Sequence, residues 1–260
     1  DRGLVGSEMC IRDSYMQDRV FTQQKKHIVD FAFNEDVVDV FPDMIRRSVP
    51  GYELVIPMGG LMAARHMGKS GTAFDLGCSL GASSLALLSQ CDSPRVRVIG
   101  VDSSAAMIAQ AKRTIDDPRI SFCCEDLLTS DVSGASVVML NFVVQFLDPE
   151  HRLTLLTRIA QQMNPDGLLI LSEKVRNADP LLQTFYDSTH LAWKRANGYS
   201  ELEVSQKRQA LENVMRVETC ESHVERLSEA GFNDVVRWFH CMNWVSFAAS
   251  PTKVLYDPSE

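Results

Sequence analysis

The sequence predicts an α/β fold in which a mostly parallel sheet carries helices on both faces. From Gly71 onward, short apolar segments alternate with helical segments, which is typical of strand–helix–strand units. The first apolar segment runs into Asp75, a glycine turn and a helix start, the arrangement that opens doubly wound folds. The strand segments are apolar without clean alternation, which favours strands covered on both faces.

The expected elements follow this alternation in order. The predicted parallel strands are Ala73–Leu76, Val96–Val101, Ile120–Cys124, Ser136–Asn141 and Leu168–Glu173. The helices expected between them include Ser83–Ser89, Ser104–Ile115 and His151–Met163. Two further apolar segments, Val235–Cys241 and Trp244–Ala249, flank Met242 and Asn243 and predict an antiparallel hairpin that completes a seven-stranded sheet.

The region before the sheet is expected to be helical. Residues 34–48 predict an amphipathic helix that begins at Asn34 and bends or breaks at Phe41-Pro42, and residues 53–67 predict a second helix. We therefore expect an N-terminal helical cap at 16–70 and a main domain at 71–260. A helical insertion at about 177–230 should cover the ligand edge of the sheet. Residues 1–15 lack a core pattern and are interpreted as a non-native leader, with Met16 as the native start.

Composition limits the function classes. The 260 residues are 45% hydrophobic, yet no apolar run approaches the roughly 20 residues of a membrane span. The net charge of −8 disfavours direct binding of nucleic acid, whose phosphates attract a basic face. Seven cysteines without C-x-x-C spacing indicate reduced thiols in a cytoplasmic protein. Six scattered histidines argue against a bound metal.

The glycine turn carries the strongest functional signal. Gly77 and Gly81 allow the backbone to approach a ligand closely, and the helix that follows presents free N–H groups. The spacing Asp-x-Gly-x-x-x-Gly differs from the Gly-x-Gly-x-x-Gly of dinucleotide sites. It resembles the first motif of S-adenosylmethionine-dependent methyltransferases.

Three polar residues follow later strands at the same edge. Asp102 ends the second strand and is expected to accept the ribose hydroxyls of an adenosine, with a helix N-cap as the alternative. Asp126 could accept from an adenine amino group while Leu127 packs on the ring, or it is a solvated turn acid. Asn141 could hold the amino-acid end of the cofactor, or it is a satisfied strand-end amide. The sequence offers no recognisable nucleophile or general base beside them.

Longer segments resemble one family, the bacterial carboxy-S-adenosylmethionine synthases. The similar segments are 33–52, Asp75–Gly81, Leu140–Leu147, Lys194–Glu203, Ser205–Arg208 and Leu211–Val214. The resemblance runs from about Met16 to the C-terminal hairpin. The glycine motif is shared by a superfamily, but the first and last segments are specific to this family.

The resemblance implies a Rossmann-like class I methyltransferase fold in a cytoplasmic homodimer without a metal. It implies that S-adenosylmethionine gains a carboxyl group from prephenate, which leaves as phenylpyruvate. The product, carboxy-S-adenosylmethionine, could co-purify, and a partner enzyme would use it to carboxymethylate the wobble uridine of tRNA. Arg208 would bind the new carboxylate, and Tyr199 lines the same pocket or packs in the core. The implied cofactor contacts are Tyr52, Gly77, Cys78, Ser79, Asp102, Ser103, Asp126, Leu127, Asn141 and Arg208; better-known members have asparagine where this chain has Ser103.

Two other functions are compatible with the same fold. An ordinary methyltransferase acting on a small molecule or tRNA would share the fold and the cofactor. A non-catalytic cofactor-binding partner of a tRNA enzyme is the second alternative. A nicotinamide oxidoreductase is disfavoured by the glycine spacing.

Overall fold

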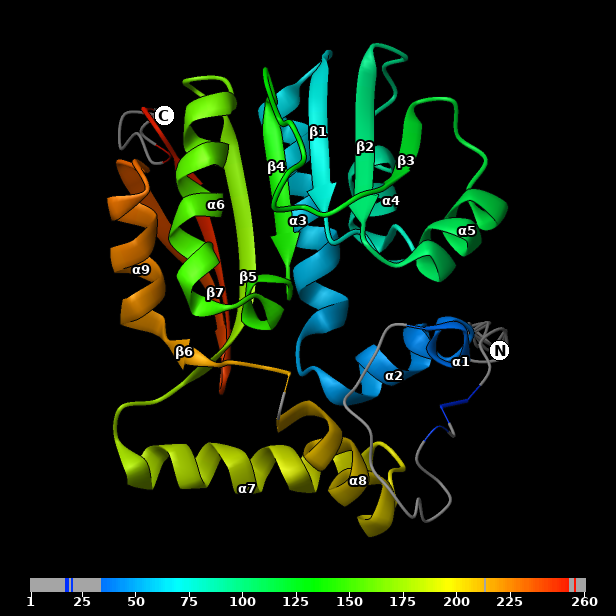
Figure 1. The fold of residues 1–260 in the computed structure, drawn as a ribbon, viewed down its shortest axis with the longest axis vertical. Helices are drawn as coiled ribbons and strands as arrows, with labels where there is room; N and C mark the ends of the chain where they lie inside the picture. The colour runs from blue at the N-terminus through cyan, green and yellow to red at the C-terminus, as the bar shows by residue number, and fades with distance from the viewer. Residues whose placement is uncertain (1–16, 19, 21–33, 213, 253–254, 256–260) are drawn as a thin grey trace, which may run out of the picture.

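The computed structural model describes residues 17–18, 20, 34–212, 214–252 and 255, and at 36, 207–209 and 211–212 it describes the backbone alone. The expected leader at 1–15 therefore lies outside the described residues. Within the described chain, the sheet order is β3-β2-β1-β4-β5-β8-β7 (Figure 1). The strands are β1 (Gly71–Leu76), β2 (Val96–Asp102), β3 (Ile120–Cys124), β4 (Val137–Asn141), β5 (Leu168–Arg176), β7 (Asp234–Cys241) and β8 (Trp244–Ser250).

The pairing confirms the predicted fold class. Strands β1 to β5 pair in parallel, whereas β8 runs antiparallel to both β5 and β7. A two-residue strand, β6 (Glu218–Thr219), lies off this path and adds to the end of β5. Parallel β1, β2 and β4 end at one edge, so the residues that follow them come together.

Helices bury both faces of the sheet. On one face, α6 (Pro149–Gln162) and α9 (Cys220–Glu229) pack against β4, β5 and β8. On the other, α3 (Tyr52–Met67) and α4 (Ala82–Leu88) pack against β1, β2, β4 and β5. Helix α5 (Ala105–Thr114) packs against β3 at the β2–β3 side of the sheet. No helix in the described part of the chain is long and apolar enough to cross a membrane.

The predicted break at Phe41-Pro42 is confirmed. The segment forms α1 (Glu35–Val38) and α2 (Phe41–Ser48), and Pro42 lies in the first turn of α2. Proline is tolerated there because the first N–H groups of a helix have no partner within the helix. The break directs α2 toward the carboxyl edge of the sheet (Figure 1).

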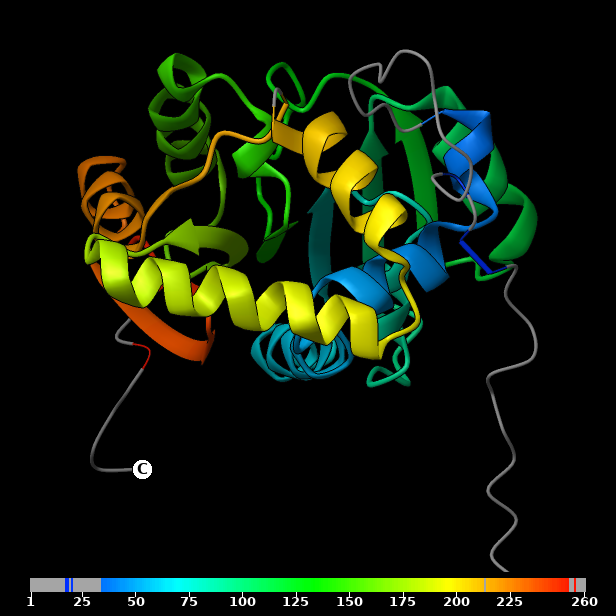
Figure 2. The same ribbon diagram turned by 90° about the horizontal axis from the view of Figure 1, so that it is seen from below.

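Residues 180–212 of the predicted insertion at 177–230 are helical and lie on the same side of the molecule, whereas its end forms β6 and α9, which pack with the sheet. Helices α7 (Pro180–Ala196) and α8 (Glu201–Glu212) cross the carboxyl edge of the sheet, as the view from below shows (Figure 2). Ser200 and Glu203 form a reciprocal capping box at the start of α8. Arg47 of α2 stacks on the ring of Tyr199 at 3.8 Å and donates to the carbonyl of Asn197, which ties α2 to the α7–α8 junction.

Candidate active site

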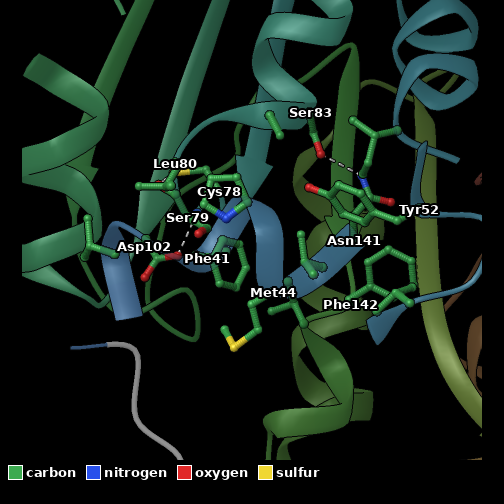
Figure 3. Close-up of a pocket in the computed structure, with 18 of the residues that line it drawn as sticks. Phe41, Met44, Tyr52, Cys78, Ser79, Leu80, Ser83, Asp102, Asn141 and Phe142 are labelled. Carbon is green, nitrogen blue, oxygen red and sulfur yellow. Dashed lines mark hydrogen bonds between the residues drawn. The ribbon is translucent and has the colours of Figure 1, made fainter. Parts of the chain in front are cut away.

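A cavity of about 960 Å³ lies at the carboxyl edge of the sheet (Figure 3). Its walls come from α2, the start of α3, the turn after β1, the end of β2 and the segment after β4. Most of these walls lie at the carboxyl edge of the sheet, where the glycine turn predicts a ligand site. Helix α2 and the start of α3 complete the enclosure.

The glycine turn is held by the neighbouring strand. The N–H groups of Gly77 and Cys78 donate to the carbonyl of Val101 at 2.7 and 3.0 Å. Gly77 has φ 76°, and a Cβ atom at this position would overlap the side chain of Val143. A side chain here would therefore be strained and would collide with the opposite wall. The absence of a side chain at Gly77 lets the turn lie against Val143.

Asp102 links the turn to the end of β2. Its Oδ2 accepts from the N–H of Ser79 at 2.9 Å, and its Oδ1 accepts from the N–H of Ser104 at 2.8 Å. The N-cap of α5 is Ser104, whose hydroxyl accepts from the N–H of Met107, so Asp102 is not the N-cap. Burial raises the pKa of the Asp102 carboxyl, and the two N–H bonds oppose that shift. Each oxygen has remaining acceptor capacity for a hydroxyl in the cavity.

A second carboxyl group, that of Asp75, holds the start of the helix that follows the glycine turn. Asp75 is fully buried at the end of β1 and accepts from both the N–H and the hydroxyl of Ser84, at 3.1 and 2.7 Å. Burial raises its pKa to about 6. The bonds join β1 to the first turn of α4, so they fix the direction in which that helix starts from the turn.

Asn141 is oriented by a chain of hydroxyl groups. Ser246 donates to Ser172 at 2.8 Å, and Ser172 donates to Oδ1 of Asn141 at 2.7 Å. The Asn141 amide then donates to Ser83 at 3.0 Å. This chain requires the carbonyl oxygen of Asn141 to face Ser172. Beside it, the rings of Tyr52 and Phe142 lie 6.1 Å apart (Figure 3).

Most of the expected contacts converge on the cavity. The lining includes Tyr52, Gly77, Cys78, Ser79, Asp102, Ser103, Leu127 and Asn141. Asp126 is exposed and lies outside that lining, and its Oδ1 accepts from the N–H of Leu128. Burial raises the pKa of the Cys78 thiol, so it lines the cavity as a neutral group.

The two residues expected on the insertion differ in their placement. Tyr199 is 5% exposed, lies outside the cavity lining and donates its hydroxyl to Asp18 at 2.6 Å. Its position therefore matches the core-packing alternative. Arg208 belongs to α8, and its side chain lies outside the described residues. Within the described chain, no group of three His, Cys, Asp or Glu side chains is placed to hold a metal ion.

Several residues that line the cavity carry no functional signal in the sequence. Phe41 and Met44 reach the cavity from α2, Ser83 from α4, and Phe142 and Gln145 from the segment after β4. The apolar spacing on α2 could have indicated Phe41 and Met44, but a core-facing helix has the same pattern. Gln145 and Phe142 needed the folded arrangement, because their segment has no regular period.

The sheet order and the cavity at its carboxyl edge are those of the class I S-adenosylmethionine-dependent methyltransferase fold. Residues 73–167 match a family described as a methyltransferase domain. Human N-acetylserotonin methyltransferase in complex with S-adenosylmethionine shares the fold at TM-score 0.58 and 17% identity, over 84% of this chain and 56% of that chain. An O-methyltransferase family protein from Burkholderia thailandensis has TM-score 0.61 at 18% identity, over 85% and 61% of the two chains.

Sequence relatives define the family more narrowly. The carboxy-S-adenosyl-L-methionine synthase of Pseudomonas entomophila is 49% identical over 242 residues, covering 90% of this chain and 98% of that protein. The synthases of Shewanella baltica and Pseudomonas putida are 46% and 48% identical, over 90% and 92% of this chain and 98% and 100% of theirs. The chain belongs to the carboxy-S-adenosyl-L-methionine synthase family and is an enzyme.

Proposed function

We propose that this enzyme converts S-adenosyl-L-methionine and prephenate into carboxy-S-adenosyl-L-methionine and phenylpyruvate. The observation that carries the proposal is that the Asp102 carboxylate and the Asn141 amide line the same cavity, on opposite sides of it in Figure 3. The first suits a ribose, and the second suits the amino-acid end of the same ligand. Membership of the synthase family supports the carboxylated product.

The second substrate follows from the chemistry that the product requires. A sulfonium methyl group is normally an electrophile, so it must lose a proton before its carbon can bond to carbon dioxide. Among the described residues that line the cavity there is no histidine or lysine to take that proton near neutral pH. A substrate that supplies its own base fits such a cavity.

Prephenate can supply both reactants. Loss of its ring carboxylate releases carbon dioxide, and the bonding electrons aromatise the ring as the 4-hydroxyl leaves as hydroxide. Hydroxide takes a proton from the sulfonium methyl group and becomes water. The resulting ylide carbon then bonds to carbon dioxide. The products of the balanced reaction are carboxy-S-adenosylmethionine, phenylpyruvate and water.

An isotope experiment tests this reaction. The purified enzyme is incubated with prephenate and S-adenosylmethionine that carries a trideuterated methyl group, and the product is analysed by mass spectrometry. We expect a product heavier by one carbon dioxide that has exchanged one deuteron for the new bond. A product that retains all three deuterons would exclude the ylide. Transfer of an intact methyl group to a small molecule or tRNA would support the alternative, an ordinary methyltransferase.

We further propose that Arg208 binds the new carboxylate, because a guanidinium matches a carboxylate with two parallel N–H donors. Arg208→Ala should then weaken binding of carboxy-S-adenosylmethionine by about 10- to 100-fold while binding of S-adenosylmethionine changes little. Arg195→Ala is the control, since Arg195 is engaged by Glu201 at the α7–α8 junction. Equal losses for both ligands in the Arg208 variant would contradict the role.

The cellular setting is part of the same proposal. A cytoplasmic homodimer would hand its product to a separate enzyme that carboxymethylates the wobble uridine of tRNA. Sedimentation of the purified protein tests the dimer. The link to tRNA is tested in cells that lack this protein but retain the partner enzyme. We expect the carboxymethylated nucleoside to be lost from their tRNA.

A further inference from the structure

Glu173 is a buried carboxyl group that the proposed reaction does not use. It lies in β5, is 0% exposed, and faces the segment that follows β4. Its Oε1 accepts from the N–H groups of Val143 and Val144 at 3.2 and 2.8 Å, and its Oε2 accepts from the N–H of Gln145 at 2.8 Å. Three successive backbone N–H groups therefore converge on one side chain.

These N–H groups belong to a strained part of the cavity wall. The residue before them, Phe142, has φ 64°, which is unfavourable for a residue with a side chain. Its own N–H donates to the carbonyl of Ser172 at 2.6 Å. Ser172 thus holds the chain before the strained residue, and Glu173 holds the chain after it.

The same contacts reach the segment that leaves α8. The carbonyl of Gln145 accepts from the N–H of Arg216 at 2.8 Å, and its side-chain Oε1 accepts from the N–H of Lys174 at 2.9 Å. The fully buried guanidinium of Arg152 donates to the carbonyls of Arg216 and Leu147 at 2.8 and 2.9 Å. The neighbour of Arg216, Met215, lines the cavity.

We propose that Glu173 is a positioning residue: it holds the wall at 142–147 in its strained form and, through Gln145, sets where the chain after α8 meets the cavity. The inference rests on the proposed function in one respect, since α8 carries the arginine expected to bind the new carboxylate. Glu173 does not touch the substrates. It fixes the wall at 142–147 relative to the segment that leaves α8, through its bond to the N–H of Gln145 and the bond between Gln145 and Arg216.

Glu173→Gln is the informative variant. A glutamine has the same shape, but its NH₂ group has no acceptor capacity, whereas either form of a carboxyl group accepts at both oxygens. At least one of the three N–H groups then faces a donor. The wall loses part of what holds Phe142 in its left-handed conformation.

The first measurement needs no substrate. Hydrogen exchange of the ligand-free enzyme, followed by mass spectrometry, should show about tenfold faster exchange in the 142–147 segment of the Glu173→Gln variant. The control is Val96→Ala, which creates a cavity at the amino end of β2, in a core cluster that contains no residue of 142–147, and lowers global stability. Unchanged exchange at 142–147 in the glutamine variant, or equal acceleration in the control, would overturn the inference.

The second measurement separates positioning from general destabilisation. The glutamine variant should lose about tenfold in kcat with prephenate. Its Kd for S-adenosylmethionine should stay within about threefold, because the hydrogen bonds that hold the side chains of Asp102 and Asn141 do not involve Glu173. The Val96→Ala variant, assayed below its melting temperature, should keep its kcat. A wild-type enzyme that does not turn over prephenate would refute the proposed function alone, and the exchange comparison would still decide the role of Glu173.

A second variant covers failure to fold. Glycine adopts a positive φ without strain, so Phe142→Gly combined with Glu173→Gln should restore cooperative unfolding if the carboxyl group acts by holding Phe142. A double variant as unfolded as the single variant would refute that role.

Discussion

Replacing Asp102 tests the cofactor site most directly. In the free enzyme its two oxygens accept from the N–H groups of Ser79 and Ser104, and they also line the cavity. A bound ribose would add hydroxyl donors to the same carboxylate. Asp102→Ala therefore removes the acceptor for the ligand and loosens the glycine turn that faces it.

The size of the effect follows from these contacts. A hydrogen bond to a charged group contributes about 1.5–3 kcal/mol, so the loss of two ribose bonds gives an upper figure near 6 kcal/mol. The pKa of Asp102 is raised by burial, which shows that its charge is already held at a cost, and we take about 3 kcal/mol as the net loss. That corresponds to a roughly 100-fold higher Kd.

Isothermal titration with S-adenosylmethionine measures this directly, and the Kd is preferred to the melting temperature because the variant also loses two internal bonds. The Kd of the Asp102→Asn variant should fall between those of the wild type and of Asp102→Ala, since asparagine keeps one acceptor oxygen. The control, Asp131→Ala, removes an exposed aspartate that accepts from Ser133 away from the cavity. An Asp102→Ala variant that binds within about threefold of wild type would refute the ribose role.

Three further predictions concern the turn and the pH dependence of stability. Gly77→Ala should cost about 1–2 kcal/mol from its φ of 76° alone, plus overlap with Val143, and should lower both the melting temperature and cofactor affinity; an unchanged melting temperature would mean that the turn is not constrained. Burial lowers the pKa of His223 to about 4 from 6.5, so the unfolded chain binds a proton before the folded one does. Stability is then full above pH 6.5 and falls by about 3 kcal/mol toward pH 4, and urea unfolding of His223→Leu should show a smaller fall. Burial raises the pKa of Glu173 from 4.5 to about 8, so its contribution is present below pH 4.5 and is lost as pH rises through 8; Glu173→Gln should have a flatter profile across that range, and an identical slope would contradict the assignment.

Local chemistry made much of the site predictable. A strand that ends in Asp75, followed by glycines at 77 and 81, limits the backbone to a turn that a ligand can approach, whatever the rest of the chain does. The end of β2 places Asp102 beside that turn because parallel neighbours end at one edge. These inferences need only short-range sequence and the geometry of a parallel sheet.

Contacts between distant segments were not predictable in the same way. Glu173 reads as one acid within an apolar strand, and its partners lie about 30 residues earlier in a segment without a period. The sequence leaves Tyr199 open between the pocket and the core; in the structure its ring lies under Arg47, which is 152 residues away in the chain. Side chains of one type serve in a site or in the core according to what packs against them, and the sequence does not state those neighbours.

The division has a physical basis. The amino-acid sequence by itself determined the parallel α/β class, the glycine turn and the edge at which a cofactor would bind, because backbone sterics and hydrophobic periodicity act over a few residues. Only the tertiary structure decided that Ser246, Ser172, Asn141 and Ser83 form one donor chain, and that a buried carboxyl group holds the opposite wall. Such groups are brought together by register and packing, which depend on the whole chain at once.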